Sequence, residues 1–112
     1  MDKLSTELTR RKDVWTLKLK GNIDSTTADL MWSTDNSNIL LKEMAQARVK
    51  KLLINLTNVE YIDSHGLRIL LNAHKDFSIE NIQIVLQNPN PHLKRLLRIM
   101  QFDRVFVIEP KD

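Results

Sequence analysis

The sequence contains no cysteine, and among its 112 residues only two are glycine and three are proline. The absence of cysteine excludes disulfide bonds, thiolate nucleophiles and every zinc site that requires a sulfur ligand. Gly21 and Gly66 are the only glycines, so the chain cannot build a phosphate-binding loop or a dinucleotide-binding fingerprint. The sequence therefore lacks the usual signatures of nucleotide chemistry and of sulfur-bound zinc.

An excess of charge of one sign is also nearly absent. Seventeen lysines and arginines stand against 14 aspartates and glutamates, and the chain has two Trp, one Tyr and three Phe. The densest basic clusters are residues 10–12 and Lys94, Arg95 and Arg98. Nucleic-acid-binding domains usually align more positive charge with aromatic side chains that stack on bases. The composition argues against direct nucleic-acid binding.

Long apolar runs are missing as well. No segment approaches the roughly 18 apolar residues of a membrane-spanning helix, and residues 1–5 begin no apolar stretch of signal-peptide length. We therefore expect a cytoplasmic protein. The chain is 42% hydrophobic and 28% charged, a balance typical of globular domains. Its length suits one domain, so we expect residues 1–112 to form a single domain.

Alternating apolar residues predict a hairpin at the start of the chain. The alternation is loose over residues 4–10 and clean at Trp15, Leu17 and Leu19, with a polar turn at residues 11–13. This pattern is typical of two strands with one buried face. We expect Gly21 to end the second strand.

A first helix is harder to define. Asp24, Ser25 and Thr26 carry side chains that favour a helix N-cap. Six polar residues of poor helix propensity then occupy positions 33–38, before apolar spacing resumes over 39–45. Two interpretations stay open, a helix broken near Asn36 and a long helix with a frayed, exposed middle.

The remainder alternates apolar strands with helical patterns. A near-continuous apolar run at 52–56 predicts a strand covered on both faces. A second helix is expected from Asp63 or Ser64, with its apolar stripe at Leu67, Leu70, Leu71, His74 and Phe77. A strand at 82–86 should follow it. A third helix is expected to be capped by Asn90, to have Pro91 as its first residue and to carry its apolar stripe at Leu93, Leu96, Leu97 and Met100, and a strand at 105–108 should close the domain. The order ββαβαβαβ predicts an α/β domain with a mixed four- to five-stranded sheet and about three helices packed on it.

The sequence offers little for catalysis. His65, His74 and His92 fall in different elements, and none has a metal-ligating partner three or four residues away. His74 lies on an apolar helical stripe, which favours a half-buried structural role. No Gly-x-Ser-x-Gly elbow is present, and no carboxylates are paired as acid and base. We expect no enzyme activity, no cofactor and no metal site.

Residues 61–67 (Tyr-Ile-Asp-Ser-His-Gly-Leu) are the most informative segment, because a buried strand leads there into Asp-Ser-x-Gly at a helix start. In the simpler interpretation, Ser64 or Asp63 caps the helix, which stabilises it by about 1 kcal/mol. Gly66 would then let another backbone approach closely.

The second interpretation of this segment is a phosphorylation switch. A hydroxyl at a helix N-terminus faces unpaired N–H groups and the positive end of the helix dipole, which favour a phosphate. A phosphate adds about −1.5 to −2 charges, and Asp63 is adjacent in the sequence. A partner docked there would meet like-charge repulsion, and binding could be lost without any unfolding of the helix.

The ordered set of motifs resembles the STAS family, the domain of anti-sigma factor antagonists and of sulphate-transporter tails. Residues 20–24 are similar to the family's strand-end "GxxD" loop and residues 61–67 to its signature "IDSxGL". The other matching segments are the central strand at 52–56, the third helix at 90–97 and the closing strand at 102–108.

The resemblance to the antagonist branch implies a partner-switching function. Ser64 would be phosphorylated by a serine kinase that is also the anti-sigma factor, and a phosphatase would reset it. The implied partner-binding residues are Asp24, Asp63, Ser64, His65 and Gly66.

Two departures from the family pattern concern the partner. About five extra residues are centred on Asp35 to Asn38, and His65 replaces a residue that is often small. A histidine there could add positive charge at mildly acidic pH, or simply bulk. An alternative function is an unswitched STAS accessory subunit that docks on the cytosolic ATPase of a membrane transporter. The sequence leaves the oligomeric state open.

Overall fold

Five strands form one mixed sheet whose order follows the chain. The computed structural model describes residues 4–24, 27 and 37–110. Strand β1 runs antiparallel to β2, and β2, β3, β4 and β5 run parallel to one another. The strands are β1 (Ser5–Thr9), β2 (Val14–Ile23), β3 (Lys51–Ile62), β4 (Gln83–Gln87) and β5 (Val107–Glu109). The predicted α/β class and mixed five-stranded sheet are confirmed.

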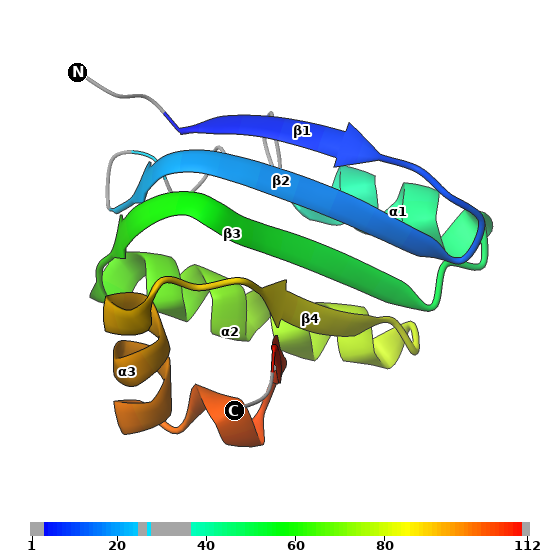
Figure 1. The fold of residues 1–112 in the computed structure, drawn as a ribbon. Coiled ribbons are helices and arrows are strands. Elements are labelled where there is room, and N and C mark those ends of the chain that lie inside the picture. Colours follow the sequence, from blue (N-terminus) through cyan, green and yellow to red (C-terminus); the bar gives the residue numbers. More distant parts are fainter. Residues whose placement is uncertain (1–3, 25–26, 28–36, 111–112) are drawn as a thin grey trace.

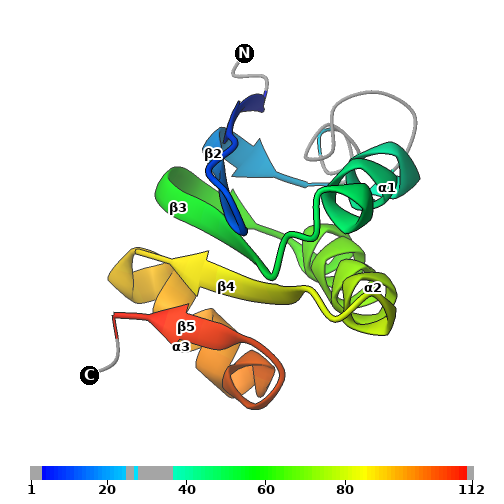
Figure 2. The ribbon, with the colours of Figure 1, turned by 90° about the vertical axis from the view of Figure 1, so that its right-hand side faces the viewer.

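Three α-helices connect the parallel strands. They are α1 (Ser37–Gln46), α2 (Ser64–Ile79) and α3 (Pro91–Ile99), and a short 3-10 helix, η2 (Phe102–Arg104), precedes β5. Helices α1 and α2 lie together on one face of the sheet (Figures 1 and 2). The predicted order ββαβαβαβ is confirmed, with η2 as an addition that the sequence pattern did not indicate.

The core lies between the sheet and the helices, because alternate strand residues point toward α1 and α2. In β2, Trp15, Leu17 and Leu19 are buried, while Lys18 and Lys20 are exposed. Leu70 and Phe77 of α2 close the core and are fully buried. His74 is half-buried, as predicted, with its ring centroid 5.3 Å from that of Phe106.

The prediction that the central strand is covered on both faces is wrong. Leu52, Ile54 and Leu56 are buried, but Leu53 and Asn55, which point to the opposite face, are partly exposed. A continuous apolar run predicts double coverage, yet Figures 1 and 2 place α1 and α2 on the same side of the sheet. Leu53 is instead flanked across the strands by Thr16 and Val85.

Gly21 does not end the second strand, contrary to expectation. Strand β2 continues to Ile23, and its pairing with β3 shifts register between Lys18 and Lys20 and again between Gly21 and Ile23. Gly21 adopts a φ of 118°, in the region that only glycine occupies without strain. Its freedom permits a bulge, so the strand bends and continues.

The end of the chain also differs from the sequence prediction. The closing strand begins at Val107 rather than Val105, because the amides of Val105 and Phe106 donate to the Phe102 carbonyl and continue the turn of η2. Met100, placed on the apolar stripe of α3, follows the helix and is 50% exposed. Leu93 and Leu97 of the same stripe are buried as expected.

The predicted first helix can be tested only in part. Helix α1 begins at Ser37, inside the polar run. The expected cap residues Ser25 and Thr26, and the stretch that would distinguish a broken helix from a frayed one, lie outside the described residues. The same holds for Asp35, which lies in the stretch on which the extra residues are centred.

Asn90 joins the start of α3 to the central strand. Its Oδ1 accepts a hydrogen bond from the Leu93 amide at 2.8 Å, the N-cap interaction that the sequence predicts, and Pro91 is the first helical residue. Its Nδ2 donates to the Val59 carbonyl of β3 at 3.3 Å. One side chain therefore both begins α3 and attaches it to the strand that leads to residues 61–67.

Replacement of Asn90 by alanine should remove both interactions. We expect Asn90→Ala to lower the free energy of unfolding by about 1–2 kcal/mol, measured by urea denaturation. Asn72→Ala, on the exposed side of α2, is the matched control and should change it by no more than about 0.5 kcal/mol. Equal effects of the two substitutions would contradict the bridging role.

Candidate functional site

The candidate site lies where β2 and β3 end and α2 begins. Ile23 and Ile62 are partners in the last register position of the two parallel strands, and the Asp63 amide donates to the Ile23 carbonyl at 3.0 Å. Asp24 and Asp63 each follow their strand directly, so both lie at one edge of the sheet. This edge, where the chain passes from β3 into α2 at the left of Figure 1, carries the five predicted site residues.

Asp63 is the N-cap of α2. Its backbone is extended, with φ −93° and ψ −177°, and its Oδ1 accepts a hydrogen bond from the Gly66 amide at 3.0 Å. Its carbonyl accepts the Leu67 amide at 3.0 Å. The sequence left Asp63 and Ser64 as alternative caps, and the structure assigns the cap to Asp63.

Ser64 is the first residue of the helix and is exposed. Its hydroxyl makes no hydrogen bond to any residue in the described part of the chain. The hydroxyl therefore stands at the N-terminus of a 16-residue helix, where the first amide groups have no carbonyl of a preceding turn to bind. Capping does not explain this serine, because Asp63 performs it.

Gly66 is buried against the ends of both strands. A Cβ at this position would lie 2.7 Å from Cγ2 of Ile23, 2.9 Å from the Ile23 carbonyl oxygen and 2.9 Å from Cγ2 of Ile62. The close backbone approach predicted for this glycine is therefore internal, between α2 and β2. Gly66 is buried, and its lack of a side chain lets the first turn of α2 pack against both strands.

A buried threonine fixes the loop that carries Asp24. Thr27 is 8% exposed, and its hydroxyl accepts the Asp24 amide at 3.0 Å and lies 2.5 Å from the Asn22 carbonyl oxygen. The Thr27 amide donates to the Asp24 carbonyl at 3.1 Å. Asp24 itself is half-buried beside the start of α2. The Thr27 hydroxyl also lies 3.2 Å from Asp24 Oδ1, so Thr27 contacts the amide, the carbonyl and the carboxylate of Asp24.

Two further side chains complete the edge. His65 is half-buried in the first turn of α2. Tyr61, which the sequence analysis did not assign to the site, is 47% exposed although it is a large aromatic residue. The strand pattern could have indicated the exposure of Tyr61, because Ile62 is buried and strand alternation turns the preceding residue toward solvent. Exposed tyrosines are frequent anchors of protein interfaces.

The site presents polar side chains and one exposed aromatic ring. Within residues 4–24, 27 and 37–110, no three His, Asp or Glu side chains are grouped so that they could hold a metal ion. No helix in these ranges has the length and apolar character that crossing a membrane requires. What the edge presents is a hydroxyl at a helix start, two carboxylates, a histidine and an exposed tyrosine.

The STAS domain family model matches residues 5–111, and the chain belongs to this family. The anti-sigma F factor antagonist of Paenibacillus polymyxa is 25% identical over 95 residues, which are 84% of this chain and 76% of that protein. A STAS-domain containing protein of Pseudomonas aeruginosa is 34% identical over 59 residues, 53% of this chain and 58% of its own length.

Transporters are also among the relatives. Low affinity sulfate transporter 3 of Stylosanthes hamata is 25% identical over 84 residues, which are 70% of this chain but 13% of the transporter. The chain thus spans a small part of the transporter and about half of the Pseudomonas protein.

Solved structures confirm the fold. The anti-sigma factor antagonist SpoIIAA in its unphosphorylated form superposes with a TM-score of 0.68 at 15% identity, over 96% of this chain and 90% of that one. An anti-sigma factor antagonist from Mycobacterium paratuberculosis gives 0.65 at 20% identity, over 96% and 86%. SpoIIAA of Bacillus has also been solved in its phosphorylated form, with a TM-score of 0.65 at 14% identity, over 96% and 93%. The chain is a STAS domain with the SpoIIAA-like fold.

Which of Asp63 and Ser64 stabilises α2 as its N-cap can be measured directly. Asp63→Ala should lower the free energy of unfolding by about 1 kcal/mol, because the helix loses its cap. Ser64→Ala should change it by less than about 0.5 kcal/mol, since the exposed hydroxyl bonds to no described residue. Urea denaturation of the two variants compares them on one scale, and the reverse order of effects would show that Ser64 is the cap.

Proposed function

We propose that this chain is an anti-sigma factor antagonist-like regulatory protein that acts by binding rather than by catalysis. Its partner is an anti-sigma factor that is also a serine kinase, bound in the cytoplasm and without direct contact to nucleic acid. Phosphorylation of Ser64 by this kinase ends the binding, and a phosphatase restores it. The observation that carries the proposal is the exposed Ser64 hydroxyl at the start of α2, a position at which Asp63 already supplies the cap.

The docking surface of the unmodified protein is the edge described above. Asp24, Asp63, Ser64 and His65 stand on a rigid support, because the Asp63 amide holds the end of β3 to β2 and Thr27 fixes the loop of Asp24. Gly66 contributes to this surface indirectly, because its lack of a side chain lets the first turn of α2 pack closely against Ile23 and Ile62. Tyr61 extends the edge with an exposed ring that can enter a pocket of the partner. A surface that is already ordered loses little conformational entropy when it binds.

A phosphate on Ser64 is compatible with the structure of the free domain and weakens its binding to the partner. In the free domain, the amides of the first turn and the helix dipole favour the added negative charge. The phosphate brings about −1.5 to −2 charges next to the half-buried Asp63 carboxylate. A docked partner would have to exclude water from both anions, which is costly unless it supplies cations. Release therefore requires no refolding of α2.

The relatives support this proposal at the level of the family. They include an anti-sigma F factor antagonist of Paenibacillus polymyxa that the chain matches over most of both lengths. The same fold is found in SpoIIAA in both its unphosphorylated and phosphorylated forms. Both findings are consistent with a domain that tolerates phosphorylation without a change of fold.

A second candidate function is an unswitched STAS subunit that docks on the cytosolic ATPase of a membrane transporter. The observation that favours it is the similarity to the sulfate transporter of Stylosanthes hamata over 70% of this chain. In this case Ser64 would remain an unmodified surface residue, and the same edge of the sheet would contact the transporter. The state of Ser64 in cells distinguishes the two functions.

Intact-mass analysis of the protein purified from its own cells tests the switch. We expect a fraction with one added phosphate, absent from Ser64→Ala and present in Ser78→Ala, in which another exposed serine of α2 is replaced. In pull-downs, Ser64→Ala should retain a protein with serine kinase activity, and Ser64→Asp should retain much less of it.

Two results would contradict the proposal. A protein that carries no phosphate during growth, stress and stationary phase would favour the transporter subunit. A phosphate that persists in Ser64→Ala and disappears in Ser78→Ala would place the modification at the other end of α2.

A further inference from the structure

Helix α3 holds a concentration of positive charge that accounts for the net charge of the whole chain. Lys94, Arg95 and Arg98 lie within five positions, and the helix contains no aspartate or glutamate. Without these three residues the chain has as many basic as acidic side chains, since it has 17 of the former and 14 of the latter. These three residues carry as much positive charge as the other dense basic cluster, residues 10–12.

The three cations line a groove together with three prolines. Pro89 and Pro91 before and at the start of α3, and Pro110 after β5, border a depression of about 440 Å³ with Lys94, Arg95 and Arg98. The Lys94 ammonium donates to the Pro110 carbonyl at 3.1 Å, which joins the start of α3 to the residue that follows β5. The groove is thus lined by proline rings and basic side chains.

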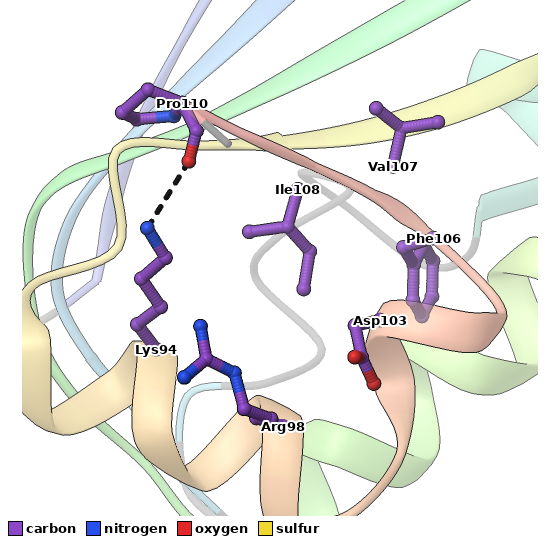
Figure 3. A pocket seen from close by; sticks show the side chains of 7 residues that line it. All are labelled: Lys94, Arg98, Asp103, Phe106, Val107, Ile108 and Pro110. Carbon is purple, nitrogen blue, oxygen red and sulfur yellow. Dashed lines mark hydrogen bonds between the residues drawn. The ribbon is translucent and has the colours of Figure 1, made fainter. Parts of the chain in front are cut away.

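A second depression of about 300 Å³ continues the groove between α3 and β5. Lys94 and Arg98 border both depressions, and Figure 3 shows the two side chains projecting from α3 beside Ile108 and Pro110. Asp103, from η2, is the one carboxylate among the described residues that line it. The described lining of the two depressions therefore contains three basic side chains and one acidic side chain.

The surroundings of α3 argue against a membrane or a nucleic acid as the ligand. Leu93 and Leu97 are 0% and 1% exposed and cannot enter a lipid surface, and the exposed Ile99 and Met100 do not line the groove. Phe106, an aromatic residue that lines the groove, is 3% exposed and offers no face for base stacking. The side of α3 that lines the groove is basic and lies beside proline rings.

We propose that this groove binds an extended acidic segment of a partner protein. The guanidinium group of Arg95, which is exposed, can pair with a carboxylate through two parallel hydrogen bonds, and Lys94 and Arg98 add positive charge beside it. The proline rings offer apolar surface against which an extended backbone can lie. This surface stands on α3 and residue 110, and its assignment does not depend on whether Ser64 is phosphorylated.

Binding of a labelled peptide tests this assignment. The probe is a fluorescein-labelled peptide of sequence Glu-Glu-Pro-Glu-Glu-Pro-Glu-Glu, and the same peptide with glutamine at every glutamate is its control. We expect anisotropy to show binding of the glutamate peptide alone, weakened by added salt because exposed ion pairs are screened. Lys94→Gln/Arg95→Gln/Arg98→Gln should reduce the affinity by about tenfold or more.

The matched control removes the same charge elsewhere. Arg11→Gln/Lys50→Gln/Lys51→Gln replaces three exposed cations near the starts of β2 and β3, at the other end of these strands from α3. This variant should bind the glutamate peptide nearly as tightly as the unaltered protein. The single substitution Arg95→Gln, at an exposed position, should weaken binding measurably and serves if the triple α3 variant fails to fold.

Three results would overturn the proposal. The first is equal loss of affinity in the two triple variants, which would mean that only net charge matters. The second is equal binding of the glutamine peptide. The third is that single-stranded DNA or vesicles of anionic lipid bind α3 while the glutamate peptide does not, which would assign the groove to another class of ligand.

Discussion

The hydrogen bonds of Asp63 fix the junction on which the candidate site depends. Its amide binds the Ile23 carbonyl and aligns the end of β3 with β2, while its carboxylate binds the Gly66 amide and begins α2. The absence of a side chain at Gly66 makes this junction possible, because a Cβ there would collide with Ile23. Two strands and a helix therefore meet so closely that a side chain larger than that of glycine does not fit between them.

This junction separates the structural role of Asp63 from the regulatory role that we propose for Ser64. Asp63 performs the capping, so the neighbouring Ser64 hydroxyl is exposed and bonds to nothing in the described ranges. In the proposed switch, a charge added to Ser64 changes the electrostatics of the surface while the cap and the strand pairing remain. The proposal thus describes a docking surface whose affinity is set by one modification. The basic side of α3, anchored to β3 through Asn90, gives the domain a second charged surface of the opposite sign.

Features decided by neighbouring residues could be predicted from the sequence, and features decided by distant contacts could not. The alternation of Trp15, Leu17 and Leu19 and the Asn90 cap are local, and both appear as predicted. The choice of Asp63 over Ser64 as cap depends on backbone angles that either residue can adopt. Gly21 was expected to end a strand but permits a bulge, and the role of Gly66 rests on Ile23, which lies far away in the sequence.

Phosphoserine placed at position 64 by synthesis or codon suppression gives the most direct test of the central claim, that modification changes the surface and leaves the fold intact. Amide NMR spectra of the modified and unmodified proteins should differ at Asp24 and in the first turn of α2. The remaining amide signals, including those of β4 and α3, should coincide, and the free energy of unfolding should not fall. Widespread shifts or a loss of α2 signals would contradict this account and indicate a conformational switch.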